Sequence, residues 1–108
     1  MINGLYSVRF RSNTGDEGSG VVISIDDKVY GGDTSYFYKG DVSTEGADIS
    51  GHMQVARHQP GDSIFGPLGD FKLDLSGTRE GDSFTLQGSV SGQLGLKIRI
   101  DGKKITNL

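Results

Sequence analysis

The chain has 108 residues, no cysteine, and a net charge of −3 from 14 acidic and 11 basic side chains. This length suits one domain covering residues 1–108, and the missing cysteines exclude disulfides, thiolate metal sites and cysteine nucleophiles. The acidic balance argues against general nucleic-acid binding, and no apolar stretch is long enough to cross a membrane. The first residues lack a signal-peptide pattern, so we expect a cytoplasmic protein.

Apolar and polar residues alternate at every second position along most of the chain, which predicts half-buried β-strands. In chain order, the expected strands cover residues 6–11, 21–25, 28–31, 36–42, 49–55, 71–76, 84–90 and 94–101. The side chains expected on their apolar, inner faces are Tyr6, Val8, Phe10, Val21, Ile23, Ile25, Tyr36, Tyr38, Val42, Ile49, Met53, Val55, Phe71, Leu73, Leu75, Phe84, Leu86, Val90, Leu94, Leu96, Ile98 and Ile100. The 18 dispersed glycines indicate turns, and no window favours more than one turn of helix, within residues 63–68 of the longest connection.

Eight consecutive strands joined by short turns need their apolar faces covered. Closing the sheet on itself covers those faces and removes both exposed edges. We therefore predict an all-β fold, an eight-stranded antiparallel up-and-down barrel of lipocalin-like form, with a two-sheet sandwich as the rival. The interior of such a barrel is just wide enough for side chains or for one small ligand.

Two glycines and an aspartate precede the fourth expected strand and could suggest a phosphate-binding loop. Such a loop would open a helix, but strand-forming residues from Thr34 onward follow here. We expect instead a structural bend at Gly31, Gly32 and Asp33, in which glycine permits positive φ. Asp33 is expected to accept hydrogen bonds from the amides of Thr34 or Ser35.

The alternation places three tyrosines inside the barrel, and each buried phenol needs a hydrogen-bond partner. Glycines also fall on inward positions at Gly40, Gly51 and Gly88, where they either allow the strands to coil or leave room. The second reading predicts a modest cavity for a small apolar ligand. Its lining residues would be Tyr6, Tyr36, Tyr38, Met53, Phe71 and Phe84.

Basic residues gather on the outer side of the first and last strands, which pair in a closed barrel. This basic seam comprises Arg9, Arg11, Lys97 and Arg99, with Lys103 and Lys104 just beyond. It is either a solvated face that discourages aggregation or a binding surface for an acidic partner. Outward-facing Phe37 and Leu5, with Ile64, Phe65 and Leu68, would form a contact patch or plug one barrel end; we expect Phe37 in a patch and Phe65 in a plug.

No catalytic or metal-binding constellation stands out. The only histidines, His52 and His58, lie far apart on an extended strand and form a thin ligand set, so we expect no metal and no cofactor. No base and nucleophile can be paired and no paired carboxylates project into the lumen, so we do not expect an enzyme. An active site around Asp33 and the tyrosines is the least favoured reading.

Three short motifs carry a resemblance to a known family: GLYSVRF near the start, GVVISIDDKVYGGD, and YFYKGDVS. In this order they resemble the GrlR-like family of bacterial negative regulators of type III secretion, from about residue 4 to residue 56 and more weakly beyond. The resemblance implies a lipocalin-like barrel, a homodimer, and sequestration of a transcriptional activator through an acidic loop. The corresponding residues 43–48 contain only Glu45 and Asp48 as acidic residues, where the family's regulator has a continuous acidic run.

The sequence thus leaves two functions open. The resemblance implies a regulator that acts through protein–protein contact at the loop with Glu45 and Asp48. The residue pattern alone adds Phe37 and the basic seam as candidate partner-binding sites. The tyrosine-lined interior points instead to a carrier or sensor of a small molecule or lipid.

Overall fold

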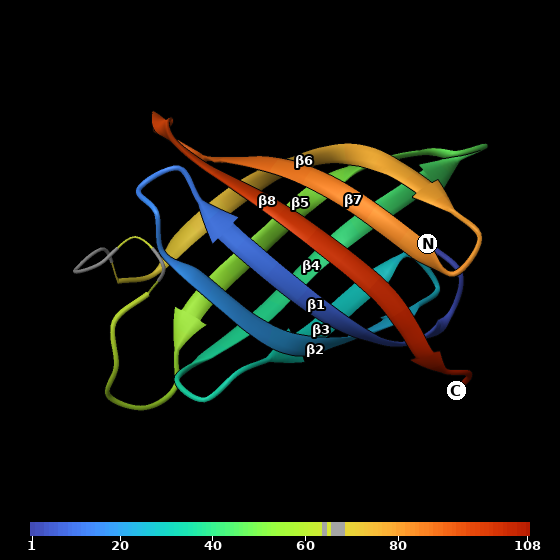
Figure 1. Cartoon of the computed structure of the whole chain (residues 1–108), viewed down its shortest axis with the longest axis horizontal. Coiled ribbons are helices and arrows are strands. Elements are labelled where there is room, and N and C mark those ends of the chain that lie inside the picture. Colours follow the sequence, from blue (N-terminus) through green and yellow to red (C-terminus); the bar gives the residue numbers. More distant parts are fainter. Residues whose placement is uncertain (64, 66–68) are drawn as a thin grey trace.

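The structure, a computed structural model, describes residues 1–63, 65 and 69–108, with the side chain of Leu94 also outside the description (Figure 1). It contains eight strands: β1 (Gly4–Ser12), β2 (Glu17–Ile25), β3 (Lys28–Gly32), β4 (Tyr36–Glu45), β5 (Asp48–Arg57), β6 (Phe71–Glu80), β7 (Ser83–Val90) and β8 (Gln93–Thr106). The described residues contain no helix.

The strands form one closed barrel in which every strand pairs antiparallel with its neighbours in the sequence. β1 pairs with β8, with Arg9 opposite Asp101 and Arg11 opposite Arg99, so the sheet has no free edge. The predicted eight-stranded up-and-down barrel is therefore confirmed, and the sandwich alternative is wrong.

Tight turns explain why several strands double back onto the previous one. Asp26 and Asp27 join β2 to β3 with φ values of 49° and 65°, the positive values that a type I′ hairpin turn requires at both positions. The strands flanking the next two tight hairpins are longer than expected, because β4 continues to Glu45 and β6 to Glu80. Only two residues then remain in each of these turns.

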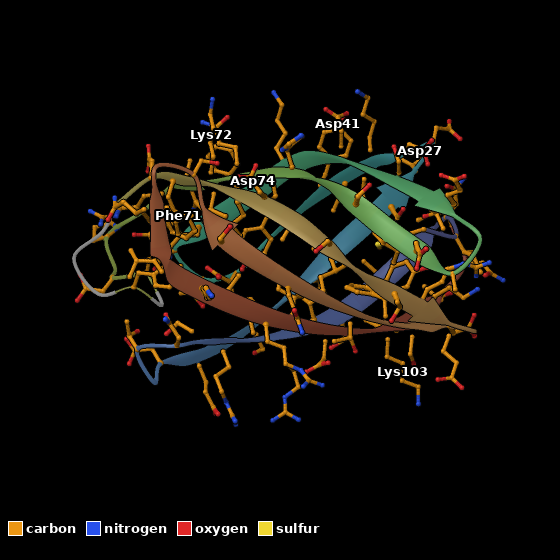
Figure 2. All side chains as sticks on the ribbon, turned by 90° about the horizontal axis from the view of Figure 1, so that it is seen from above. Asp27, Asp41, Phe71, Lys72, Asp74 and Lys103 are labelled. Carbon is orange, nitrogen blue, oxygen red and sulfur yellow. The ribbon has the colours of Figure 1, made fainter. Side chains whose placement is uncertain are left out.

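Alternation along the strands places apolar side chains in the barrel interior and polar ones outside. Figure 2 shows Phe71 within the outline of the barrel, whereas Lys72 of β6 and Lys103 of β8 project outward on opposite sides. The buried core draws residues from all eight strands and from Phe65 in the connection between β5 and β6.

The β2 strand faces the opposite way from the sequence expectation. Val22 is 4 % exposed and lies opposite Tyr6, whereas Val21, Ile23 and Ile25 are 39–47 % exposed on the outside. Residues directly opposite in an antiparallel pair share a face, so the register with β1 decides which valine is buried. The other inward positions of β2 include Gly18 and Gly20, which a hydrophobic pattern does not reveal.

Several inward glycines allow neighbouring backbones to approach closely. A Cβ atom on Gly31, Gly40, Gly51 or Gly77 would lie under 3.0 Å from a carbonyl oxygen of the adjacent strand. A Cβ on Gly88 would instead collide with the side chains of Leu75 and Ile98. The first four glycines thus serve the coiling of the barrel wall, and the space beside Gly88 is occupied by these two side chains.

Candidate functional site

A cavity of about 540 Å³ occupies the barrel interior. Its lining is mainly aliphatic and aromatic and includes Val8, Val22, Val42, Val55, Leu73 and Ile98. Small-molecule sites typically enclose roughly 300–1,000 Å³ behind a mainly apolar lining. The size and lining of this cavity therefore suit one small apolar ligand.

The cavity reaches the surface at one end of the barrel. Lining residues from the β1–β2 turn, the β3–β4 turn and the β5–β6 connection meet at that end, on the left in Figure 1. Among them, Asp16, Thr34 and Asp62 are solvent-exposed. We call this end the cavity mouth, defined by Asp16, Asp33, Thr34, Ser35, Asp62 and Ser63.

The opposite end of the barrel is filled by side chains. Tyr6 packs edge-on against Phe84 with ring centroids 5.4 Å apart, and its hydroxyl donates to the carbonyl of Ile2 at 2.6 Å. Lys104 turns toward the same end, where its ammonium lies 3.3 Å from Asp82. Of the six residues predicted to line the lumen, Tyr36, Tyr38, Met53, Phe71 and Phe84 do so, whereas Tyr6 is buried beside the cavity and does not line it.

Asp33 organises the cavity mouth. Its Oδ1 accepts hydrogen bonds from the amides of Ser35 at 3.0 Å, as expected, and of Tyr36 at 2.8 Å, which was not expected. Its Oδ2 accepts the hydroxyl proton of Tyr38.

The two preceding glycines do not play the expected part in a bend. Gly31 and Gly32 both lie within β3, and neither has positive φ. A Cβ on Gly31 would collide with the carbonyl of Val21, so close strand approach explains this glycine. The turn itself is made by Asp33 together with the residues that follow it.

Tyr36 and Tyr38 have their polar ends held at the mouth. Burial, together with the hydrogen bond to Asp33, raises the pKa of Tyr38 far above its ordinary value, so this phenol stays protonated. The Tyr36 hydroxyl donates to the carbonyl of Gly61 at 3.4 Å and accepts from Arg57 Nη2 at 3.1 Å. The Arg57 guanidinium also lies 5.7 Å from the centre of the Tyr36 ring.

Arg57, which contacts Tyr36 beside the mouth, is a residue that sequence reasoning missed. It lies opposite Tyr36 in the β4–β5 pairing, in which Glu45 lies opposite Asp48 around the two-residue turn. Assigning that turn to residues 46–47 would have fixed the register and placed Arg57 beside Tyr36.

The basic seam is less positive than the sequence suggested. Arg11 Nε donates to Glu17 at 2.7 Å, and Arg99 Nε lies 3.2 Å from Asp101. Lys104 was expected near the seam but faces the filled barrel end. The seam thus carries both signs of charge, which reduces its attraction for an acidic partner.

The other predicted partner-binding residues lie apart from the seam. Glu45 and Asp48 are exposed and face each other at the tip of the β4–β5 hairpin. Phe37 is exposed on β4, opposite Gly32 of β3. Phe65 is buried and packs edge-on against Phe71 with centroids 5.3 Å apart, as expected of a plug, whereas Ile64 and Leu68 lie outside the described residues.

An exposed apolar surface extends over β2 and its neighbours, and only its member Phe37 was expected in a contact patch. We call it the β2 outer face, and it comprises Val21, Ile23, Ile25, Tyr30 and Phe37, each 39–47 % exposed. Cross-strand pairing makes it contiguous, because Ile23 lies opposite Tyr30 and Gly32 links Val21 to Phe37. Contiguous apolar patches of a few hundred Å² often mark interaction sites.

The histidines are paired separately. His52 Nδ1 lies 3.0 Å from Asp74 Oδ1, and His58 Nε2 lies 3.1 Å from the carbonyl oxygen of Asp33. Within residues 1–63, 65 and 69–108, no three His, Cys, Asp or Glu side chains gather to hold a metal ion. The same residues include no helix of the length and apolarity needed to cross a membrane.

Comparison with known proteins adds no assignment: no protein-family model matches the chain, and no curated protein matches it.

Proposed function

We propose that the protein acts by binding, as a carrier or sensor that holds one small, largely apolar molecule inside its barrel. The observation that carries this proposal is the cavity of about 540 Å³, with its apolar lining and its opening at one end. The wall is hydrogen-bonded around its full circumference, so a ligand would enter a preformed site and pay little for ordering it. Asp33, Tyr36 and Tyr38 are engaged with protein groups, which favours binding over catalysis.

The affinity of an alkyl ligand for such a cavity should increase with the length of its alkyl chain. Each methylene group moved from water into an apolar environment contributes about 0.8 kcal/mol. Two further carbons on an alkyl ligand should therefore tighten binding roughly fifteenfold, until the cavity is full. Octanol and decanol, titrated against a neutral fluorescent probe such as N-phenylnaphthylamine, test this dependence.

The cavity can be blocked from a known position. Val55 lines the cavity and Gln54 is its exposed neighbour on β5, so Val55→Phe places a ring inside and Gln54→Phe places the same ring outside. We expect Val55→Phe to weaken probe binding at least tenfold and Gln54→Phe to leave it unchanged. Equal binding by both folded variants would show that the probe sits on the outer surface and would reject the proposal.

A second candidate function is regulation through contact with another protein. The β2 outer face supports it, because five large apolar side chains are exposed together on one side of the barrel. The motifs that resemble the GrlR-like family would make the partner a transcriptional activator of type III secretion genes, or a second copy of this chain.

The two candidates are separated by a charge placed on the β2 outer face. The wild type, Ile23→Asp and the control Ser50→Asp are each used to recover binding proteins from extract of the native cell. Regulation by contact is supported if a protein binds the wild type and Ser50→Asp but not Ile23→Asp. Equal recovery by both variants would argue against this face as the contact. The sequence expectation of a cytoplasmic location stays a proposal, which cell fractionation tests.

A further inference from the structure

The cavity has two chemically different ends, and this difference constrains its ligand. The deep part is lined by Val29, Val42 and Phe84, whereas polar side chains line the mouth. A ligand with an apolar body and one polar head would therefore lie with its head at the mouth, beside Asp33. The chemistry of that head follows from which hydrogen-bonding groups remain available there.

Three hydroxyls at or beside the mouth donate their protons to protein acceptors. Tyr38 donates to Asp33 Oδ2, Tyr36 donates to Gly61, and Ser35 donates to the carbonyl of Pro60 at 3.1 Å. A hydroxyl has one proton and two lone pairs, so toward a ligand Tyr38 and Ser35 can only accept, and Tyr36 already accepts from Arg57 Nε and Nη2.

Asp33 also presents an acceptor. An ionised carboxylate offers about four lone-pair positions and no proton. Three donors occupy the carboxylate of Asp33: two backbone amides on Oδ1 and the Tyr38 hydroxyl on Oδ2. One position on Oδ2 remains for a donor supplied by the ligand.

The charged groups around the mouth, like its hydrogen-bonding groups, favour a ligand head that supplies donors. The described residues that line the cavity include Asp16, Glu17, Asp33 and Asp62 but no lysine or arginine. The amino terminus of Met1, which also lines the cavity, lies at the opposite end, where it donates to Thr44 Oγ1. Glu17 is paired with Arg11 on the outer surface and is not counted here. The nearby cation Arg57 is exposed and interacts electrostatically with Asp62 and Asp70, so Asp62 is not counted either, and Asp16 and Asp33 carry the charge argument.

We propose that the cavity selects an apolar molecule with a protonated amine head, which donates to Asp33 Oδ2, over a molecule of equal length with a carboxylate head. This inference rests on the proposed ligand-binding function and names its ligand class. A protonated amine supplies donors only and carries the charge opposite to Asp33, whereas a carboxylate supplies acceptors only and carries the same charge. An alcohol, which is neutral and has one donor, should fall between them.

Decylamine, decanol and decanoate test the proposal, because they share one alkyl chain and differ in the head. Each displaces N-phenylnaphthylamine from the wild type at neutral pH and low salt, below its micelle concentration. We expect decylamine to displace the probe at a concentration at least tenfold lower than decanoate does, with decanol in between. Decylamine binding must also fall in Val55→Phe; undiminished binding would place the amine outside the cavity and overturn the proposal.

Asp33→Asn isolates the contribution of the charge. An asparagine oxygen can still accept from the amides of Ser35 and Tyr36, so the turn is retained. We expect this variant to bring decylamine and decanoate to within about threefold of each other, while decanol changes little. The control is Asp26→Asn, in the turn at the opposite barrel end, which should keep the wild-type order.

The outcomes distinguish the two proposals. Equal or tighter binding of decanoate, or a preference that survives in Asp33→Asn, would overturn the amine assignment and leave the cavity as a ligand site. Failure of all three compounds to displace the probe would overturn the ligand-binding function itself, together with the amine assignment.

Discussion

The orientation of β2 makes a quantitative prediction, because two adjacent valines differ in burial. Val22 is 4 % exposed inside the barrel and Val21 is 47 % exposed outside it. Replacing valine by alanine removes about two methyl groups, worth roughly 0.8 kcal/mol each when they are buried. The space left behind adds a smaller penalty, because Val22 already borders the cavity. We therefore expect Val22→Ala to lower the free energy of unfolding by about 2 kcal/mol, and Val21→Ala to change it by less than about 0.5 kcal/mol.

Urea unfolding followed by far-ultraviolet circular dichroism measures this difference. The chain has no tryptophan, so fluorescence would rely on its 4 tyrosines and serves only as a second probe. The two variants should have equal denaturant slopes and different midpoints, the sign of a change in stability alone. A larger loss in Val21→Ala would mean that β2 presents its other face to the core, which requires a one-residue shift against β1.

Two further predictions concern the wall and the mouth. A Cβ on Gly77 would collide with the carbonyl of Thr85, whereas one on Gly95 would meet nothing within 4 Å. Gly77→Ala should therefore lower the free energy of unfolding by at least about 2 kcal/mol, and Gly95→Ala should leave it almost unchanged. Comparable urea midpoints of the two variants would contradict the close approach of β6 and β7. The folded-state pKa of Tyr38 lies above the unfolded value of about 10, so its contribution to stability is complete below that pH and is lost as pH rises. Tyr38→Phe should therefore be less stable at neutral pH and lose part of the alkaline destabilisation; unchanged pH dependence of the thermal midpoint would refute this.

The sequence was sufficient for the fold because alternation survives in nearly every strand. Phe71, Leu73 and Leu75, for example, occupy every second position and are all buried. It was insufficient for β2, where Val21, Val22 and Ile23 form an unbroken apolar run that fits either face. Only the register with β1 resolves such a run, and register depends on turns whose ends are set by backbone geometry.

The site was only partly predictable for related reasons. Five lining residues followed from alternation. Tyr6 is buried inside the barrel as expected, but it does not line the cavity, because it packs against Phe84 and donates its hydroxyl proton to Ile2 at the filled end. No periodic pattern announces that contact. The cavity volume depends on how much of the interior all the inward side chains fill together. The contact between Arg57 and Tyr36 depends on the register of β4 and β5. Neither can therefore be obtained from any single stretch of sequence.

The close approach of strands at glycine also bears on how likeness between barrels should be interpreted. Gly31 and Gly40 stand in the motifs that suggested a regulator family, and at both positions a side chain would collide with the neighbouring backbone. Any small barrel that bends its wall at these points must place glycine there, whatever it binds and whatever its ancestry. In a saturation mutagenesis screen these two positions should be as intolerant as a true contact residue, so glycine spacing alone reports the shape of the wall and not descent or purpose.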